Sequence, residues 1–332
     1  MVSAGNRKTW TGLPCVILVA VTILGPVPAA ACSFAGPVDL MGYAVLADLE
    51  SGRERTLTFE PVSIGGMCEP LNDMDIQKDV ALLELSDGVR LFTLDGDLGE
   101  ITLPGQFPSE PTLDGEYVYY LNSGDGSLRR VHWGTRTMDV LFEGIPDTFG
   151  VDELLVADGI ASWGTDNRVS VFDTATRTLL LNASRIPVPD LSFVPVGLHA
   201  GRLTLLGSGS AVNGTLVVTF DWATNETVAI AELPMDGADP AANHGTAAQD
   251  GDRLAYLHDG LHVLNLTSNA TTDYPRRIPG VNLAFAGSLI AYNRYETTRP
   301  WDHLVRIAIV GIAVIAGVFA FAVLRRPRAI AP

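Results

Sequence analysis

Short apolar segments recur along the chain, each directly after a tight turn signal. The glycines of these signals lie 44, 42, 50 and 36 residues apart. Glycine is favoured there because a tight connection between two strands needs a positive φ. A period of about 40 residues is typical of radial β-repeats rather than of helical solenoids. The turn signals are Asp114-Gly115, Asp158-Gly159, Ala200-Gly201, Asp250-Gly251 and Ala286-Gly287.

Each repeat contains four predicted strands that differ in pattern. The strand before the turn is expected to be innermost, and the strand after it is strongly apolar. The third strand alternates between apolar and polar positions, which indicates a strand with one face buried. The fourth is shorter and more polar, as expected of an outer edge. Examples of the second strand are VALLEL (80–85) and RLAYL (253–257), and of the third RVSVFD (168–173) and TLVVTFD (215–221).

The two ends of the repeat array complement each other. The last repeat stops after SLIAYN (288–293), two strands short, and two strands stand alone at the start, YAVLADL (43–49) and RTLTFEP (55–61). Pairing them in one sheet removes the exposed edges that a linear array would leave. The sequence therefore predicts an all-β ring of six four-stranded blades, closed by N- and C-terminal strands.

This pattern resembles a β-propeller of the broad class that includes TolB-like, YVTN-like and quinoprotein-like repeats. The residues that carry the likeness are Asp250-Gly251-Asp252-Arg253-Leu254-Ala255-Tyr256, followed by Gly260-Leu261-His262-Val263-Leu264. The likeness covers nearly all of residues 40–295. It departs from the pattern at Lys78-Asp79, where the other blades have glycine, and the WD40 and sialidase signatures are missing. The resemblance implies a fold and no activity.

The N-terminus has the features of a secretory signal. Arg7 and Lys8 form a basic start, an apolar core too short to span a bilayer follows, and Ala29-Ala30-Ala31 forms a small-residue cleavage site. We expect residues 1–31 to be removed and 32–295 to form the propeller ectodomain. An uncleaved anchor is the alternative.

The C-terminus predicts one transmembrane α-helix. Ile307 to Leu324 is an uninterrupted apolar run of 18 residues, followed by Arg325, Arg326 and Arg328. We expect a linker at 296–303, a span at 304–324 and a basic cytoplasmic tail at 325–332, because positive residues stay on the cytoplasmic side. The propeller would then be extracytoplasmic, on a single-pass type I protein of the cell membrane. A buried core helix is the alternative, although such a helix would show a polar face.

Cysteines and sequons agree with export. Removal of the signal leaves the pair Cys32 and Cys68, for which we expect a disulfide. Lipidation of Cys32 is the alternative. Five Asn-x-Ser/Thr sequons are candidate glycosylation sites, although Asn and Thr are also common in surface hairpins. By their place in the repeat, Asn225, Asn265 and Asn269 are expected on the face of the ring opposite to that of Asn182 and Asn213.

Charge narrows the class of partner. Residues 33–302 hold 16 basic and 38 acidic residues, a net charge of −22. A field of that sign repels nucleic acid and anionic lipid head groups. The expected partner is therefore a protein, an envelope polymer or a neighbouring membrane subunit, and no nucleic acid.

Candidate chemistry is sparse. Two acidic groups have spacings that suit Ca²⁺ through oxygen ligands, although neither matches an EF-hand. Residues that precede the turns are candidates for the central channel, with solvated loop residues as the alternative. His258 and His262 flank a hairpin turn, and Ser208 and Ser210 lack a catalytic motif. The acidic groups are Asp73, Asp75, Asp79 and Asp95, Asp97, Glu100, and the channel candidates are Asp75, Glu153, His199, His244 and Gln249.

These observations favour an exported, membrane-anchored propeller that acts as a binding or scaffolding module at the cell surface. No catalytic residue is identified, and no cofactor is expected apart from a candidate Ca²⁺. A propeller-type hydrolase or lactonase with a Ca²⁺-dependent channel site is one alternative. An accessory subunit of a larger membrane complex is the other.

Overall fold

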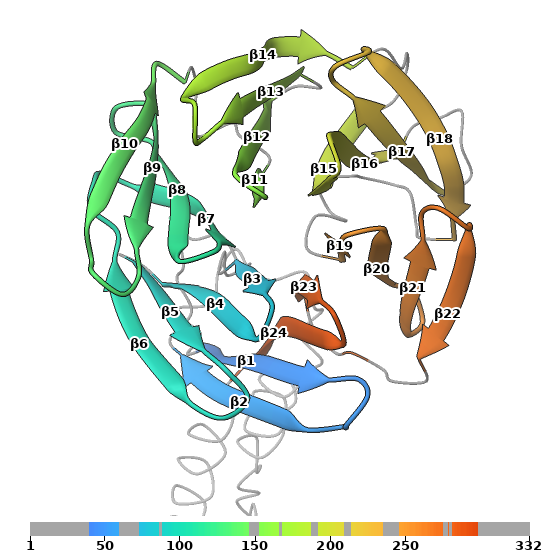
Figure 1. Cartoon of the computed structure of the whole chain (residues 1–332). Helices are drawn as coiled ribbons and strands as arrows, with labels where there is room; N and C mark the ends of the chain where they lie inside the picture. The colour runs from blue at the N-terminus through green and yellow to red at the C-terminus, as the bar shows by residue number, and fades with distance from the viewer. Residues whose placement is uncertain are drawn as a thin grey trace, which may run out of the picture.

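The chain forms a ring of six four-stranded antiparallel sheets around a central channel, within the residues that the structure describes (Figure 1). The computed structural model describes residues 40–59, 73–85, 88–145, 153–165, 168–186, 192–208, 214–234, 246–274, 278 and 281–297. The predicted all-β six-bladed propeller is thus confirmed.

The first three blades follow the chain, and each is numbered from its innermost strand outward. Blade 1 is β3 (Met74–Gln77), β4 (Val80–Leu85), β5 (Gly88–Phe92) and β6 (Asp97–Thr102). Blade 2 is β7 (Pro108–Asp114), β8 (Tyr117–Asn122), β9 (Ser127–His132) and β10 (Met138–Glu143). Blade 3 is β11 (Leu154–Ala157), β12 (Ile160–Thr165), β13 (Arg168–Asp173) and β14 (Thr178–Arg185).

The other three blades complete the ring, and the last combines both ends of the array. Blade 4 is β15 (Ser192–His199), β16 (Arg202–Ser208), β17 (Thr215–Asp221) and β18 (Glu226–Leu233). Blade 5 is β19 (Ala247–Asp250), β20 (Arg253–Leu257), β21 (Leu261–Asn265) and β22 (Ala270–Tyr274). Blade 6 is β23 (Val281–Ala286), β24 (Leu289–Thr297), β1 (Leu40–Asp48) and β2 (Glu54–Phe59).

Blade 6 closes the ring as the sequence predicts. Strand β1 pairs antiparallel with β24 over nine residue pairs, from Leu40 opposite Thr297 to Asp48 opposite Leu289. The innermost strand of every blade begins on one face of the ring, which we call the entry face. The tight turns lie on the opposite face, the turn face. Leu40 and Thr297 both lie at the entry face, so the two ends of the described propeller meet there.

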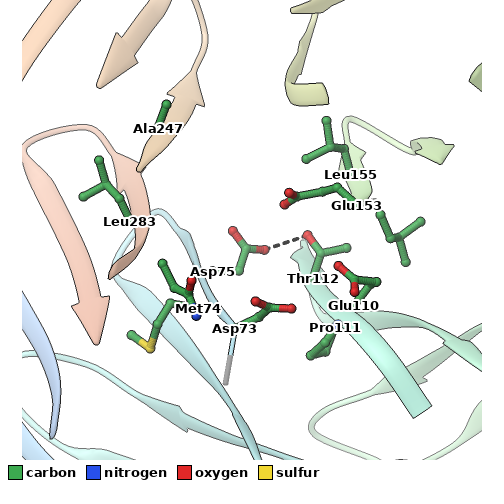
Figure 2. Close-up of a pocket in the computed structure, with 12 residues that line it drawn as sticks. Asp73, Met74, Asp75, Glu110, Pro111, Thr112, Glu153, Leu155, Ala247 and Leu283 are labelled. Atoms are coloured by element: carbon green, nitrogen blue, oxygen red, sulfur yellow. Dashed lines mark hydrogen bonds between the residues drawn. The ribbon is translucent and has the colours of Figure 1, made fainter. Parts of the chain in front are cut away.

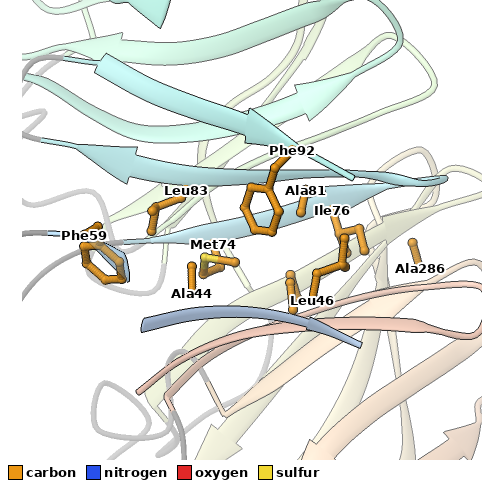
Figure 3. Packing of buried hydrophobic residues seen from close by; sticks show 11 residues of the cluster. Ala44, Leu46, Phe59, Met74, Ile76, Ala81, Leu83, Phe92 and Ala286 are labelled. Atoms are coloured by element: carbon orange, nitrogen blue, oxygen red, sulfur yellow. The ribbon is translucent and has the colours of Figure 1, made fainter. Parts of the chain in front are cut away.

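Six apolar clusters fill the seams between neighbouring blades. One cluster joins Ala44, Leu46 and Phe59 of blade 6 to Met74 and Phe92 of blade 1, among others (Figure 3). Each of the other five clusters likewise joins two consecutive blades. Burial of this apolar area is the main stabilising contribution to the ring.

Second strands are buried on both faces, and so is the third strand β13, for which the sequence predicted one buried face. Ala81, Leu82 and Leu83 are consecutive, and each is fully buried. Leu82 packs in the seam with blade 2, whereas Ala81 and Leu83 pack in the seam with blade 6. Successive side chains point to opposite faces of a strand. A blade that packs between two neighbours therefore needs apolar residues at both odd and even positions. This explains the continuous apolar run VALLEL.

The tight turns between first and second strands share a length but not a glycine position. Gly115, Gly251 and Gly287 stand first in their turns, with φ between 60° and 62°, whereas Gly159 and Gly201 stand second, both with φ 77°. The glycines that define the predicted period therefore occupy either of two neighbouring turn positions. In blade 1 the first turn position is Lys78, which has φ 55° without being glycine.

A second turn repeats more regularly and was missed in the sequence. In five blades, the side chain of the last third-strand residue accepts hydrogen bonds from backbone N–H groups two or three residues later. The residue four positions after it has a positive φ. The capping residues are Asp48, His132, Asp173, Asp221 and Asn265, and the positive-φ residues are Gly52, Arg136, Arg177, Asn225 and Asn269.

Several predictions fall outside the described residues. These are the signal peptide at 1–31, the linker beyond Thr297, the span at 304–324 and the tail at 325–332, together with Cys32, Cys68, Asn213 and His244. Among the residues that are described, no helix has the length and apolar character needed to cross a membrane.

Candidate functional site

The six innermost strands surround a channel of about 590 Å³. Four of the five predicted channel residues line it, namely Asp75, Glu153, His199 and Gln249. The fifth, His244, is not among the described residues. The prediction that residues before the tight turns point toward the channel is confirmed for these four.

Asp75 fastens the innermost strand of blade 1 to that of blade 2. Its Oδ2 accepts hydrogen bonds from Thr112 Oγ1 at 2.7 Å and from the Leu113 backbone N–H at 2.6 Å. Its Oδ1 accepts one from the Ile76 N–H at 2.7 Å. Burial raises the pKa of the Asp75 carboxyl above its usual range, partly offset by these hydrogen bonds. The carboxyl therefore satisfies backbone groups that face the channel.

Similar side-chain bridges cross from blade to blade at the turn face. The Gln77 Oε1 accepts a hydrogen bond from the Gly115 N–H at 2.6 Å. Asp114 Oδ2 accepts one from the Gly159 N–H at 2.9 Å, and Asp250 Oδ2 one from the Gly287 N–H at 2.8 Å. The polar residues at the ends of innermost strands thus stabilise the ring, and their presence does not indicate catalysis.

Four carboxylates gather where the channel opens on the entry face. A hollow of about 60 Å³ there is lined by Asp73, Asp75, Glu110 and Glu153 (Figure 2). Burial and the negative charge of Asp73 raise the pKa of the Glu84 carboxyl, on β4, well above its usual range. We call Asp73, Asp75, Glu110 and Glu153 the acidic mouth. It concentrates negative charge on the entry face.

The loop 103–107 presents an exposed aromatic side chain on the same face. Phe107 is 68% exposed and has φ 57°, an unfavourable conformation for a bulky residue. The loop is held in place because the N–H groups of Ser123 and Gly124 donate to the carbonyls of Phe107 and Gln106, at 3.2 and 2.9 Å. Tyr120 Oη also donates to the Pro104 carbonyl at 2.6 Å.

Phe107 stands three residues before Glu110, which has φ 52°. Sequence reasoning missed both residues. The Pro-Gly and Phe-Pro pairs in LPGQFP (103–108) are the signal that marks this loop as unusual.

The second group of Ca²⁺ candidates is engaged by arginines. Asp97 and Glu100 both form ion pairs with Arg90, and Asp95 pairs with Arg53. Asp79 lies in the tight turn of blade 1, at the opposite end of β3 from Asp73. Within the described ranges, no group of three or more His, Cys, Asp or Glu side chains has an arrangement that could hold a metal ion.

The histidine pair forms a structural contact. His262 Nε2 lies 2.6 Å from the carbonyl oxygen of His258, and its Nδ1 lies 2.7 Å from Asp273 Oδ1. The Tyr256 ring stacks on His262, with centroids 5.1 Å apart. Both ring nitrogens of His262 are therefore already in hydrogen-bonding contact within blade 5.

Sequon placement agrees with the prediction for three sites and differs for one. Asn225, Asn265 and Asn269 lie in the capped turns of the turn face, as expected from their place in the repeat. Asn182 does not lie in an entry-face loop but within β14, the outermost strand of blade 3, where it is exposed. The difference arises because a bulge extends β14 beyond this position.

Comparison with known proteins identifies the fold. No protein-family model and no curated protein sequence matches the chain. A putative TolB from Agrobacterium tumefaciens aligns with a TM-score of 0.52 at 8% identity, over 77% of this chain and 99% of that one. A propeller in a nidogen/laminin complex aligns with 0.41 at 14% identity, over 70% and 92%. TolB from Acinetobacter baumannii gives 0.39 at 12% identity, over 77% and 66%. The chain is therefore a six-bladed β-propeller similar to TolB-like propellers.

Proposed function

We propose that this protein is an exported, single-pass membrane protein whose propeller binds a partner through its entry face. The observation that carries the proposal is the exposed, conformationally unfavourable Phe107, three residues before Glu110 of the acidic mouth. Aromatic anchors dominate the energy of many protein interfaces, and unfavourable backbone conformations concentrate at functional sites. The rigid loop presents the ring without an ordering cost on binding.

The position of the chain ends supports an entry face that is close to the bilayer. Leu40 and Thr297 are paired at that face. Thr297 is ten residues before Ile307, the start of the apolar run. Ten residues span at most about 35 Å when fully extended. A partner that contacts the entry face is therefore a membrane-associated protein or an envelope polymer near the membrane.

The charge of the surface defines the chemistry of the partner. The acidic mouth and the net charge of −22 over residues 33–302 favour a basic group, such as a lysine or arginine side chain, next to an apolar one. We propose that the basic group enters the acidic mouth while the apolar group packs on Phe107.

Affinity capture from native membranes tests this binding function. The partner recovered with the full-length protein is quantified for Phe107→Ala and for the control Val228→Ala, which truncates another exposed apolar residue, on β18. Loss of a hot-spot residue lowers affinity by roughly 30-fold. We expect that loss for Phe107→Ala only. Equal recovery with both variants would overturn the proposal.

Lysine labelling tests export. Lys78 is exposed on the turn face, and Lys8 is the chain's other lysine. A membrane-impermeant amine reagent applied to intact cells should modify Lys78, and Lys78→Arg should remove the labelled peptide. Labelling of Lys78 only after lysis would show that the propeller is inside the cell.

A Ca²⁺-dependent hydrolase is the second candidate, because four carboxylates line the acidic mouth, although the described side chains form no metal-binding group as they stand. Oxygen ligands of this kind suit Ca²⁺. Calorimetric titration of the ectodomain with CaCl₂ tests this candidate. Stoichiometric binding that Asp73→Asn abolishes would support it, and no binding at millimolar Ca²⁺ would eliminate it.

A further inference from the structure

One of the six outermost strands lacks the acidic residues that the others have. Outermost strands have unpaired backbone N–H and C=O groups, and charged side chains are a common means of preventing edge-to-edge pairing. Five of the strands contain at least one acidic residue, and β14 contains none. Its sequence is TLLLNASR, with Arg185 as the last residue. In so acidic a chain, an outer strand without a carboxylate is an exception.

Two irregularities interrupt the pairing of β14 with β13. The strand has eight residues against six of β13, with register shifts on either side of Val171. Leu180, at the first shift, is 46% exposed. At the second shift, Asn182 and Ala183 stand between Leu181, opposite Val171, and Ser184, opposite Val169.

The bulge at Asn182 is held by hydrogen bonding. Ala183 adopts φ 42° and donates its N–H to Ser170 Oγ at 3.0 Å. A bulge of this kind re-aims side chains and is a built feature of the strand. It leaves Asn182 exposed two residues after Leu180.

We propose that an N-linked glycan on Asn182 takes the place of the missing acidic residue and shields this edge, whose one charged residue, Arg185, stands at its end. Asn182-Ala183-Ser184 is an acceptor sequon. In the modification, Asn182 Nδ2 loses a proton and bonds to the anomeric carbon of a lipid-linked oligosaccharide, and the bond from that carbon to the carrier phosphate breaks. The hydrated sugar covers Leu180 and blocks strand pairing with a second copy of the chain.

The place of blade 3 in the ring fits this role. Blade 3 lies across the channel from blade 6, where both ends of the described chain meet (Figure 1). The β14 edge therefore faces away from the proposed membrane tether, where it is accessible to neighbouring molecules. The inference rests on the proposed export, because sugar transfer of this kind occurs outside the cytoplasm.

Peptide mass mapping and sedimentation of protein purified from native membranes test the inference. We expect a glycan on Asn182. The variants Asn182→Gln and Ser184→Ala should both lose it and show a several-fold increase in the dimer and oligomer fraction. Asn182→Lys should lose the glycan and stay monomeric, because the lysine restores a charge at the edge. Asn225→Gln, on the turn face, is the matched control and should leave self-association unchanged.

The outcomes separate the inference from the proposed function. A labelled Lys78 with an unmodified Asn182 overturns the glycan and leaves export standing. An Asn182→Gln protein that remains monomeric overturns the shielding role. An unlabelled Lys78 together with bare sequons overturns both.

Discussion

The two faces of the ring differ in how much they repeat. On the turn face, five blades have a capped turn of the same length, and all six have a two-residue turn between the first and second strands. On the entry face, the position five residues before the tight turn is acidic in blades 1 to 3, as Asp73, Glu110 and Glu153, and neutral in blades 5 and 6, as Thr246 and Asn282. Within the described residues, the turn face thus keeps the same structural device in most blades, whereas the charge of the entry face changes around the ring, which favours the entry face as the one available for recognition.

The largest expected effect is the loss of the link between blades 1 and 2. Asp75→Ala leaves Thr112 Oγ1 and the Leu113 N–H without their acceptor beside the channel. Each unsatisfied buried group costs about 1–3 kcal/mol, so the free energy of unfolding should fall by about 3 kcal/mol. Urea denaturation measures the free energy of unfolding. The control is Asp79→Ala, which changes an exposed turn residue. A small change for Asp75→Ala would show that its hydrogen bonds are dispensable.

A smaller effect is expected for a turn-face cap. The Asn265 Oδ1 accepts hydrogen bonds from Thr267 N, Ser268 N and Ser268 Oγ, and its Nδ2 donates to Asp252. Asn265→Ala in unglycosylated protein should lower the free energy of unfolding by about 1.5 kcal/mol. Asn269→Gly keeps the positive φ and should cause little change. Equal destabilisation by both would contradict the capping role.

The tight turn of blade 1 is the one without glycine, and substitution of Lys78 tests the cost of its positive φ. Lys78→Gly should raise the free energy of unfolding by about 0.5–1 kcal/mol, because glycine removes the strain of φ 55°. The reverse change at the equivalent position of blade 5, Gly251→Ala, should lower the free energy of unfolding by a similar amount. An added Cβ would meet no atom within 4 Å there, so the positive φ is the only source of the loss. Thermal denaturation of both variants gives the comparison. Destabilisation by Lys78→Gly would mean that the side chain matters more than the backbone.

The smallest effect is a dependence on pH at the entry face. The folded state raises the pKa of Asp75 and of Glu84, so both carboxyls hold a proton more tightly than in the unfolded chain. Their contribution to stability is fully present below the unfolded-state values and is lost as the pH rises through the folded values. Glu84→Gln should therefore flatten the decline of stability above pH 4.5, the ordinary value for this carboxyl. If Glu84→Gln leaves the pH dependence of stability unchanged, other titratable groups cause the decline.

The architecture could be predicted because it depends on local pattern. Apolar runs after tight turns gave the blades, and the two missing strands gave the closure between β1 and β24. The capped turn was also visible, as Asp173 and Asp221 followed four residues later by Arg177 and Asn225. It was missed because glycine was taken as the marker of the repeat.

The entry face could not be predicted in the same way. Asp73 and Glu110 meet only because β3 and β7 begin side by side, and they lie 37 residues apart in the chain. The exposure of Phe107 depends on hydrogen bonds from Ser123 and Gly124, in a different hairpin. The bulge at Asn182 likewise arises from the register between β13 and β14, which the alternation of residues does not specify.

Site-specific photocrosslinking in native membranes tests whether the partner is bound through the entry face. A photoreactive residue placed at Phe107 on the entry face is compared with one placed at Val228 on the outer rim, since both positions are exposed. A discrete crosslinked adduct is expected from position 107 and none from position 228. An adduct from position 228 alone, or equal diffuse labelling from both, would contradict recognition through the entry face.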